Sequence, residues 1–478
     1  MKRFLICVAI LMIPALAFGQ ADTTGRVNLK VTDEEGKPVP QARVEIISSA
    51  MQGERIHTTD DRGRLLASLL PPGSYALTIT SPGMETVNLT FRINIGQTVP
   101  LDVTLKAGEM TEMVTVYGTA TPLETTTLGE NFNYDKQVEE LPVVDRDIEA
   151  VATYGPNISF GPTPGTLAIS GAPSFDTTVL LDGAEISDPY FGSAAPLFLE
   201  DAIEETQLLT SGVSARYGRF QGGVVNAVTK SGGNSFAGTL RAEFDKDSWN
   251  SKSPYGEDLS DQLNELYQLT LGGYFMKDHL WFFAGLRGAP SEAASNTTIG
   301  TSESFVTKGD QERYQIKLTG ALTANHVIAL GYLNSEREII DRAGLPAGDL
   351  NAANGHRLDP RETITGTYQG VLTDTMFLDL IVTKKDVSIA SGGDPTPQPG
   401  FDFGRSPFLD YYVPSYAIYN NHWWDFEDPS LRNNQTVALN LTNVFATSWG
   451  DHTLEYGIQY VDSETGGLNN QSSTGFNL

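Results

Sequence analysis

The C-terminal half of the chain is dominated by long segments in which apolar and polar residues alternate. From about residue 236 onward, apolar side chains recur at every second position, as in Leu454, Tyr456, Ile458 and Tyr460. A period of two predicts β-strands with one apolar and one polar face. We expect about nine such strands of about ten residues each, a length that crosses a bilayer when tilted. A soluble β-sandwich would show similar alternation, so the periodicity alone does not separate the two possibilities.

The lengths of the connections favour a transmembrane barrel over a sandwich. Short turns are expected near Lys277-Asp278, Ala324-Asn325, Thr373-Asp374 and Gly450-Asp451. Long polar connections are expected between them, at about 246–262, 289–310, 337–361 and 388–432. Short and long connections therefore alternate strictly, as they do in transmembrane β-barrels, where the short turns share one side of the membrane. We interpret residues 235–478 as part of a barrel wall.

Composition argues against several functional classes. The chain has 32 Lys and Arg residues against 59 Asp and Glu residues, and a formal net charge of −27 disfavours nucleic-acid binding. Cys7 is the single cysteine and the six histidines form no HExxH pair, so no cysteine-based zinc site is possible. No catalytic triad spacing or phosphate loop stands out, and we predict no enzyme, cofactor or metal. Beyond the N-terminus no apolar run suffices for a membrane helix, so a membrane-spanning chain would have to be a β-barrel.

The N-terminus has the pattern of a secretory signal peptide. Lys2 and Arg3 form a basic start, and an apolar run extends over residues 4–15. Small residues follow, and cleavage is predicted between Gly19 and Gln20. Residues 1–19 therefore predict export of the protein.

Residues 24–107 predict a small β-sandwich of short strands between regular turns. Val27, Leu29 and Val31 alternate with polar residues, as in a strand with one buried face. The segment resembles carboxypeptidase regulatory-like domains, through these matching residues: Gly25, Val27, Asp33, Gly36, Pro38, Val39, Ala42, Val44, Asp60, Gly63, Leu70, Pro72, Gly73 and Tyr75. That family has a transthyretin-like fold and is a non-catalytic accessory module, so the resemblance implies no peptidase activity.

A glycine-rich stretch, Ile203–Leu240, precedes the alternating segments and contains seven glycines between β-branched runs. Glycine permits positive φ and close backbone approach, so this stretch can follow tight bends in a crowded space. Taken alone, it could also be a loop between two strands of a soluble β-protein. It resembles the end of the plug domain of TonB-dependent outer-membrane receptors, through these matching residues: Tyr217, Gly218, Gly222, Gly223, Val224, Asn226, Thr229, Lys230 and Ser231.

Residues 141–234 resemble such plug domains throughout, and we assign them to an α+β plug. A short helix is expected at the start, because Val144, Ile148 and Val151 share one helical face. Plugs of this type often have Arg-Gly where this chain has Ser170, so no role of that arginine is transferred to it.

Several plug residues are predicted to have structural roles. Asp182-Gly183 follows three apolar residues and predicts a hairpin turn, so Asp182 is interpreted as structural and not catalytic. We hypothesise that Arg216 and Arg219 are held by carboxylates on the inner face of the barrel, such as Glu243. The predicted structural residues of the plug are Asp182, Gly183, Arg216, Tyr217, Gly218, Arg219, Gly222 and Gly223.

Residues 108–140 are polar and Thr-rich, and predict a linker with one β-prone island, Met113–Tyr117. In the receptors that the plug resembles, a segment at this place is the TonB box, which adds as a strand to an energy-transducing protein. The resemblance implies a box at Glu112, Met113, Val114, Thr115, Val116 and Tyr117. Such a box has to be extended and unpaired, whereas the competing interpretation makes the island an extra strand of the preceding sandwich.

The order of the segments resembles the Oar-like subset of TonB-dependent receptors, which carry a carboxypeptidase regulatory-like domain. The expected fold is mainly β: a transthyretin-like β-sandwich, an α+β plug, and the first part of an antiparallel transmembrane β-barrel. The resemblance implies energised transport of a scarce ligand across the Gram-negative outer membrane, with a TonB-type protein, outer-membrane lipid and an extracellular ligand as partners. The alternative is a secreted or surface-attached adhesive β-sandwich protein. About nine strands are too few to close around a plug, so we expect the N-terminal part of a longer receptor.

Overall fold

The computed structural model is mainly β. It describes residues 23–51, 53–108, 114–117, 128–133, 148–161, 166–188, 199–214, 216–249, 263–297, 304–323, 325–340, 356–373, 375–392, 429–447 and 450–467. The predicted signal peptide, with Gly19 and Gln20, lies outside the described residues. So do Glu112 and Met113 of the predicted box.

The N-terminal part is a sandwich of two sheets. The first sheet has the order β4-β1-β7 and consists of β1 (Gly25–Asp33), β4 (Arg64–Leu70) and β7 (Thr98–Leu105). The second has the order β3-β2-β5-β6-β8 and consists of β2 (Arg43–Ser48), β3 (Arg55–Thr58), β5 (Gly73–Thr80), β6 (Val87–Ile93) and β8 (Val114–Tyr117). Val27, Leu29 and Val31 are fully buried in the shared core. The predicted sandwich and its alternation are therefore confirmed.

The second part is the plug. Its main sheet has the order β13-β12-β15-β14-β9 and consists of β9 (Leu128–Asn133), β12 (Thr178–Leu181), β13 (Ala184–Glu185), β14 (Ile203–Ser211) and β15 (Val224–Thr229). Smaller elements complete it: helix α2 (Ile148–Ala152), strands β10 (Ile158–Phe160) and β11 (Leu167–Ile169), and 3-10 helices η3 (Ser174–Asp176) and η4 (Glu200–Ala202). Ile148 and Val151 of α2 are fully buried, as the predicted helix requires, while Val144 lies outside the described residues.

Strand β9 corrects one prediction, because it lies in the segment interpreted as a linker. It pairs antiparallel with β14, with Asn133 opposite Glu205 and Asn131 opposite Gln207. Its Gly, Glu and Asn residues have low β propensity, which is why the sequence did not indicate a strand. The edge of β14 supplies the backbone hydrogen-bond partners that local sequence cannot reveal.

The third part is a curved wall. Within the described residues it is one antiparallel sheet of nine strands in chain order, which confirms the predicted number. The strands are β16 (Ala237–Asp245), β17 (Asn264–Met276), β18 (Leu280–Thr297), β19 (Ser304–Thr323), β20 (His326–Ile340), β21 (His356–Thr373), β22 (Met376–Gly392), β23 (Ser430–Thr447) and β24 (Gly450–Gly466), with η5 (Asp247–Trp249) after β16. Their lengths of 9 to 20 residues exceed the predicted ten or so. They extend into predicted long connections such as 289–310, because backbone pairing continues through polar sequence.

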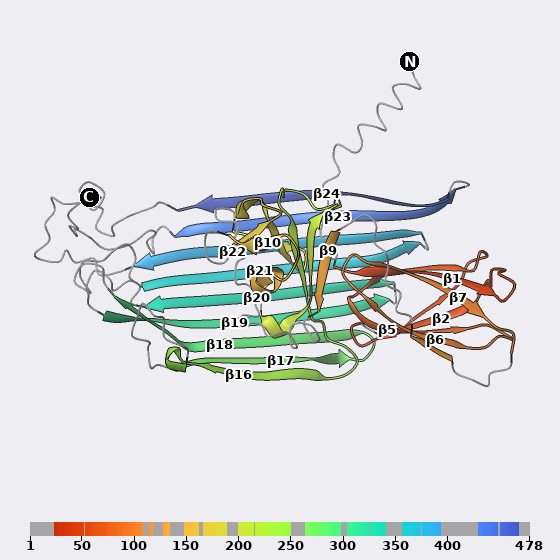
Figure 1. Cartoon of the computed structure of the whole chain (residues 1–478), viewed down its shortest axis with the longest axis horizontal. Helices are drawn as coiled ribbons and strands as arrows, with labels where there is room; N and C mark the ends of the chain where they lie inside the picture. Colours follow the sequence, from red (N-terminus) through yellow and green to blue (C-terminus); the bar gives the residue numbers. More distant parts are fainter. Residues whose placement is uncertain are drawn as a thin grey trace, which may run out of the picture.

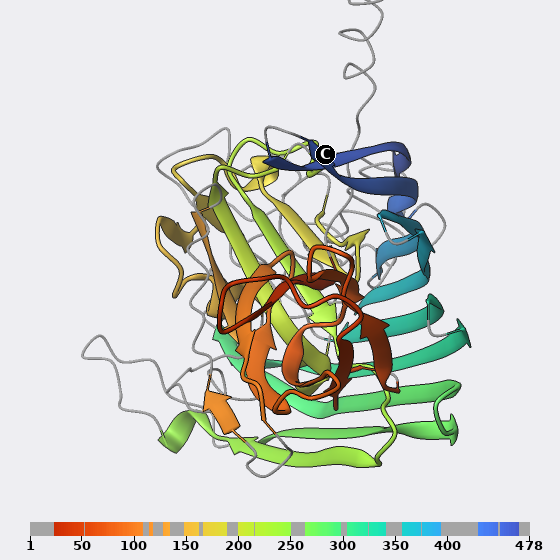
Figure 2. The same cartoon turned by 90° about the vertical axis from the view of Figure 1, so that its right-hand side faces the viewer.

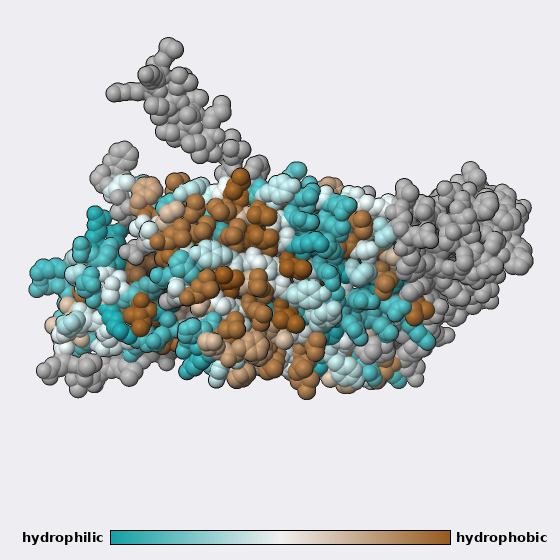
Figure 3. All heavy atoms as spheres, turned by 180° about the vertical axis from the view of Figure 1, so that it is seen from behind, coloured by the Kyte–Doolittle hydropathy of each residue, from teal (hydrophilic) through white to brown (hydrophobic). Residues whose placement is uncertain are grey.

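The two faces of the wall differ as the alternation predicted. On β17, Gln268 and Thr270 are 2% and 3% exposed on the plug side, whereas Leu269 and Leu271 are each 47% exposed on the other side. Figure 3 shows the apolar residues gathered over the middle of the outer face. This arrangement matches the outer surface of a membrane barrel, where apolar side chains face lipid.

The three parts contact one another. The wall strands run side by side and the sandwich lies at one end of them, where residues 277–279 turn between β17 and β18 (Figure 1). Seen from that end, the wall curves around the plug strands (Figure 2). No helix in the described part of the chain is long and apolar enough to span a membrane.

Candidate functional site

Asp182 is a turn residue that also joins the plug to the wall. Asp182 and Gly183 connect β12 to β13 with positive φ angles of 49° and 83°, so the predicted hairpin is confirmed. The Asp182 carboxylate accepts a hydrogen bond from the Thr229 backbone N–H at 3.0 Å. Lys317 of β19 donates to the same carboxylate at 3.2 Å and to the Thr229 carbonyl at 3.1 Å. One carboxylate therefore stabilises the plug sheet and anchors it to a wall cation.

Further wall cations pair with plug carboxylates. The pairs are Arg287–Glu200 at 2.9 Å, Arg313–Glu200 at 3.4 Å, Arg432–Asp188 at 3.4 Å and Arg241–Asp201. None of these side chains is more than 19% exposed, so solvent screens the pairs only weakly. These pairs between wall and plug favour a single orientation of the plug, because each charge would lose its partner in another.

Arg216 and Arg219 do not contact Glu243, which corrects that hypothesis. Glu243 pairs with Arg241 of its own strand at 3.3 Å. Arg216 is buried and lies 3.9 Å from a carboxylate oxygen of Glu455 on β24, so its partner is a wall carboxylate, but on the opposite edge of the sheet. Arg219 has a positive φ of 62° and pairs at 3.1 Å with Glu185, which belongs to the plug itself.

The glycines of the junction lie where backbone segments approach closely. A Cβ at Gly223 would lie 2.7 Å from the Leu209 carbonyl oxygen, and one at Gly232 would overlap backbone atoms of wall strands β17 and β18. Gly218 has no atom near its Cβ position within the described residues, so space does not explain that glycine. Tyr217 is buried beside this bend, and desolvation raises the pKa of its hydroxyl.

The sandwich is bound to the plug by two polar side chains of β14. The Ile95 backbone N–H donates to Glu205 Oε1 at 2.8 Å, and Gln207 Nε2 donates to the Ile95 carbonyl at 2.7 Å. Glu205 is fully buried, and desolvation raises its pKa to about 7 despite the Ile95 hydrogen bond and Arg92 at 3.7 Å. One residue of the sandwich thus has both backbone groups satisfied by the plug.

Arg26 of β1 also reaches beyond the sandwich. Its guanidinium pairs at 2.6 Å with Glu455 of the wall, the same carboxylate that faces Arg216 of the plug. Gln369 of β21 donates to Thr23 at 3.2 Å. Sandwich, plug and wall therefore meet at one shared junction.

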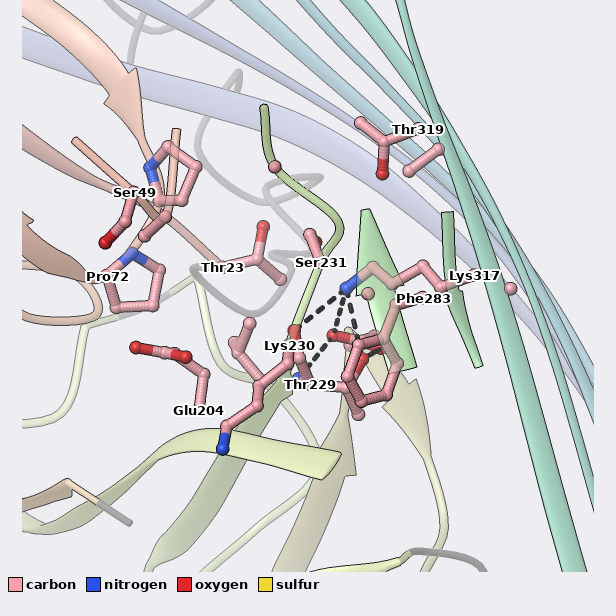
Figure 4. Close-up of a pocket in the computed structure, with 18 of the residues that line it drawn as sticks. Thr23, Ser49, Pro72, Glu204, Thr229, Lys230, Ser231, Phe283, Lys317 and Thr319 are labelled. Carbon is pink, nitrogen blue, oxygen red and sulfur yellow. Dashed lines mark hydrogen bonds and ion pairs between the residues drawn. The ribbon is translucent and has the colours of Figure 1, made fainter. Parts of the chain in front are cut away.

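A cavity of about 400 Å³ lies at this junction (Figure 4). Its lining includes Thr23, Ser49 and Pro72 of the sandwich, Thr229 and Ser231 of the plug, and Lys317 and Thr319 of the wall. The hydroxyl-rich lining suits water or a small polar molecule more than a large apolar one. No group of His, Cys, Asp and Glu side chains suited to a metal ion occurs within the described residues.

The described part of the predicted box, Val114–Tyr117, is a strand. It pairs parallel with β6, with Val114 opposite Val87 and Tyr117 opposite Thr90. The structure therefore shows the competing interpretation, in which this island extends the sandwich. An exposed edge of β6 offers the backbone groups that make this pairing favourable.

Sequence reasoning missed the residues that join the three parts. No joining role was assigned to Glu205, Gln207, Lys317, Glu200 and Glu455, because nothing in the local sequence distinguishes them from other polar residues of strands and turns. Glu205 lies in β14 (Ile203–Ser211), which the structure shows to be almost entirely buried although its sequence is largely polar. A carboxylate in such a strand needs a specific partner.

The polar-inside, apolar-outside wall with a charged plug on its concave face is the arrangement of plugged outer-membrane receptors. Residues 26–106 match the family model described as carboxypeptidase regulatory-like domain. Over 310 residues the chain is 28% identical to the TonB-dependent transporter Oar of Myxococcus xanthus, covering 60% of this chain and 28% of Oar. The predicted resemblance to Oar-like TonB-dependent receptors is therefore confirmed.

Solved structures share the fold. The outer membrane transporter YddB from Escherichia coli matches with a TM-score of 0.53 and 15% identity, over 70% of this chain and 48% of YddB. A ferric enterobactin receptor (PfeA) mutant from Pseudomonas aeruginosa matches with a TM-score of 0.51 and 14% identity, over 70% of this chain and 48% of the receptor. The chain thus spans about half the length of these structures, and less than a third of Oar.

Proposed function

We propose that this chain is part of a TonB-dependent transporter that moves a scarce ligand across the Gram-negative outer membrane. The observation that carries the proposal is the plug held on the polar face of a wall whose opposite face is apolar. The apolar face suits outer-membrane lipid, and the plug excludes passive flow through the wall. Similarity to the TonB-dependent transporter Oar supports energy coupling to an inner-membrane TonB-type protein.

In this proposal the sandwich is residues 24–107, the linker with the box 108–140, the plug 141–234, and the barrel wall 235–478. Force reaches the plug through Val114–Tyr117. Residues 118–127 connect this segment to β9 and can span at most about 35 Å. Since β9 is the edge strand of the plug sheet and pairs with β14, a pull on the box acts on this sheet after a short extension.

The decisive experiment combines fractionation with cross-linking in the native host. The protein should sediment with the outer membrane, and Thr115→Cys should form a disulfide with cysteines placed on the edge strand of the TonB-type protein. Thr104→Cys is the matched control, because Thr104 is exposed on β7 in the other sheet of the sandwich. Recovery outside the outer membrane, or equal cross-linking from both positions, would contradict the proposal.

A further inference from the structure

The described part of the box segment, β8, is an edge strand of the sandwich. Within the described residues its second sheet ends with β8, which pairs with β6 through four residues, Val114 to Tyr117. The neighbouring pair β5 and β6 is antiparallel and extends from Gly73 to Ile79. Parallel pairing is slightly less stable per residue than antiparallel pairing, so β8 is the more easily released of the two neighbours of β6.

The sandwich that binds β8 is itself held against the transport machinery. Ile95 is hydrogen-bonded to Glu205 and Gln207 of the plug, and Arg26 is paired with Glu455 of the wall. The sandwich cannot follow a pull on β8 without breaking these contacts. A force on the segment therefore acts first on the β6–β8 ladder.

We propose that the carboxypeptidase regulatory-like domain stores the box segment as the fifth strand of its second sheet, so that the TonB-type protein must take Val114–Tyr117 from β6 by strand exchange. The inference rests on the proposed function, in which the TonB-type protein binds Val114–Tyr117. It identifies β6 as the strand that competes with this partner for the segment. The same backbone N–H and C=O groups serve β6 in one state and the partner's sheet edge in the other. The domain thereby sets the fraction of receptors that can engage the partner.

The contact between β14 and Ile95 connects storage to the state of the plug. Glu205 and Gln207 lie on the strand that also pairs with β9, and β9 follows the box by residues 118–127. A change in the plug that shifts β14 therefore alters its hydrogen bonds to Ile95 of the sandwich. Because β14 also pairs with β9, the same shift alters the distance between β8 and β9.

A disulfide between β6 and β8 tests the proposal on the full chain. Asn88 and Thr115 are register partners, and adjacent strands place Cα atoms within disulfide range. The variant is Asn88→Cys with Thr115→Cys, and its control is Asn88→Cys with Thr78→Cys, which joins β6 to β5 and leaves β8 free. Disulfide yield and binding of the purified periplasmic domain of the host's TonB-type protein are measured in the oxidised and reduced states.

We expect both disulfides to form. Oxidation should weaken partner binding by at least roughly tenfold in the Asn88/Thr115 variant only, and reduction should restore it. Failure of this disulfide to form while the control disulfide forms would show that β8 is not stored on β6. Equal binding of the oxidised and reduced forms would show that the partner adds to the far edge of β8, and would also overturn the proposal. If the unmodified receptor does not bind the partner, the proposed function is refuted, and so is the exchange of β8 between β6 and the partner. The yield of the Asn88/Thr115 disulfide still reports in that case whether β8 is paired with β6.

Discussion

Glu205→Gln is expected to remove a pH dependence from the contact between sandwich and plug. Glu205 is fully buried and accepts the Ile95 N–H, and desolvation raises its pKa to about 7 from an ordinary value of 4.5. The Ile95 hydrogen bond and Arg92 oppose this rise, whereas the neighbouring Glu204 adds to it. A glutamine keeps an acceptor for the Ile95 amide but does not titrate.

The sign follows from the raised pKa. The folded value lies above the unfolded one, so the contribution of the carboxyl to stability is fully present below about pH 4.5 and is lost as the pH rises through about 7. A shift from 4.5 to about 7 corresponds to roughly 3 kcal/mol at about 1.36 kcal/mol per pKa unit. The wild-type contact should therefore be weakest in mild alkali.

Hydrogen exchange of the Ile95 amide provides the assay, because this proton exchanges only after its bond to Glu205 opens. Comparing wild type with Glu205→Gln at each pH cancels the intrinsic pH dependence of exchange. The ratio of their protection factors should change by roughly 50- to 100-fold between pH 5 and pH 8. Gln207→Met, the control, should lower protection by a similar factor at every pH. A constant ratio for Glu205→Gln across this range would refute the reasoning.

Two further predictions concern stability of the purified protein. Gly223→Ala should lower the thermal midpoint of unfolding by an amount equivalent to about 1–3 kcal/mol, because the new Cβ would lie 2.7 Å from the Leu209 carbonyl oxygen. Gly218→Ala, the control, should change the midpoint little. Equal midpoints for the two variants would contradict this prediction. Arg216→Met should destabilise more than Arg219→Met in urea titrations, by roughly 1–2 kcal/mol, because the Arg216 side chain is 8% exposed and that of Arg219 is 50% exposed. A larger effect at Arg219 would be inconsistent with the observed pairs.

The parts of the fold predicted correctly depend on residues near each other in the chain. Alternation predicted the wall and its number of strands, because each strand must separate a polar face from an apolar one. Asp182-Gly183 predicted a hairpin, because a tight turn needs positive φ at both residues. The crowding around Gly223 was also expected from the glycine pattern.

The corrected predictions depend on distant partners. Glu243 was chosen for Arg216 because it is near in sequence, but the curvature of the wall brings β24 to the plug and places Glu455 there. Strand β9 has a composition that resembles a linker, and only the edge of β14 makes it a strand. Strand lengths were underestimated because backbone pairing at the ends of the wall continues through mostly polar sequence.

The sequence by itself determined the order of sandwich, plug and wall, and the face that each wall strand turns outward, because periodicity and turn residues act locally. Only the tertiary structure decided which strand edges pair and which charges meet. Val114–Tyr117 shows the difference most clearly: its β propensity predicted a strand, yet not whether β6 or another protein would pair with it. Backbone N–H and C=O groups are the same at every strand edge, so the choice of partner depends on which edge the fold brings within reach.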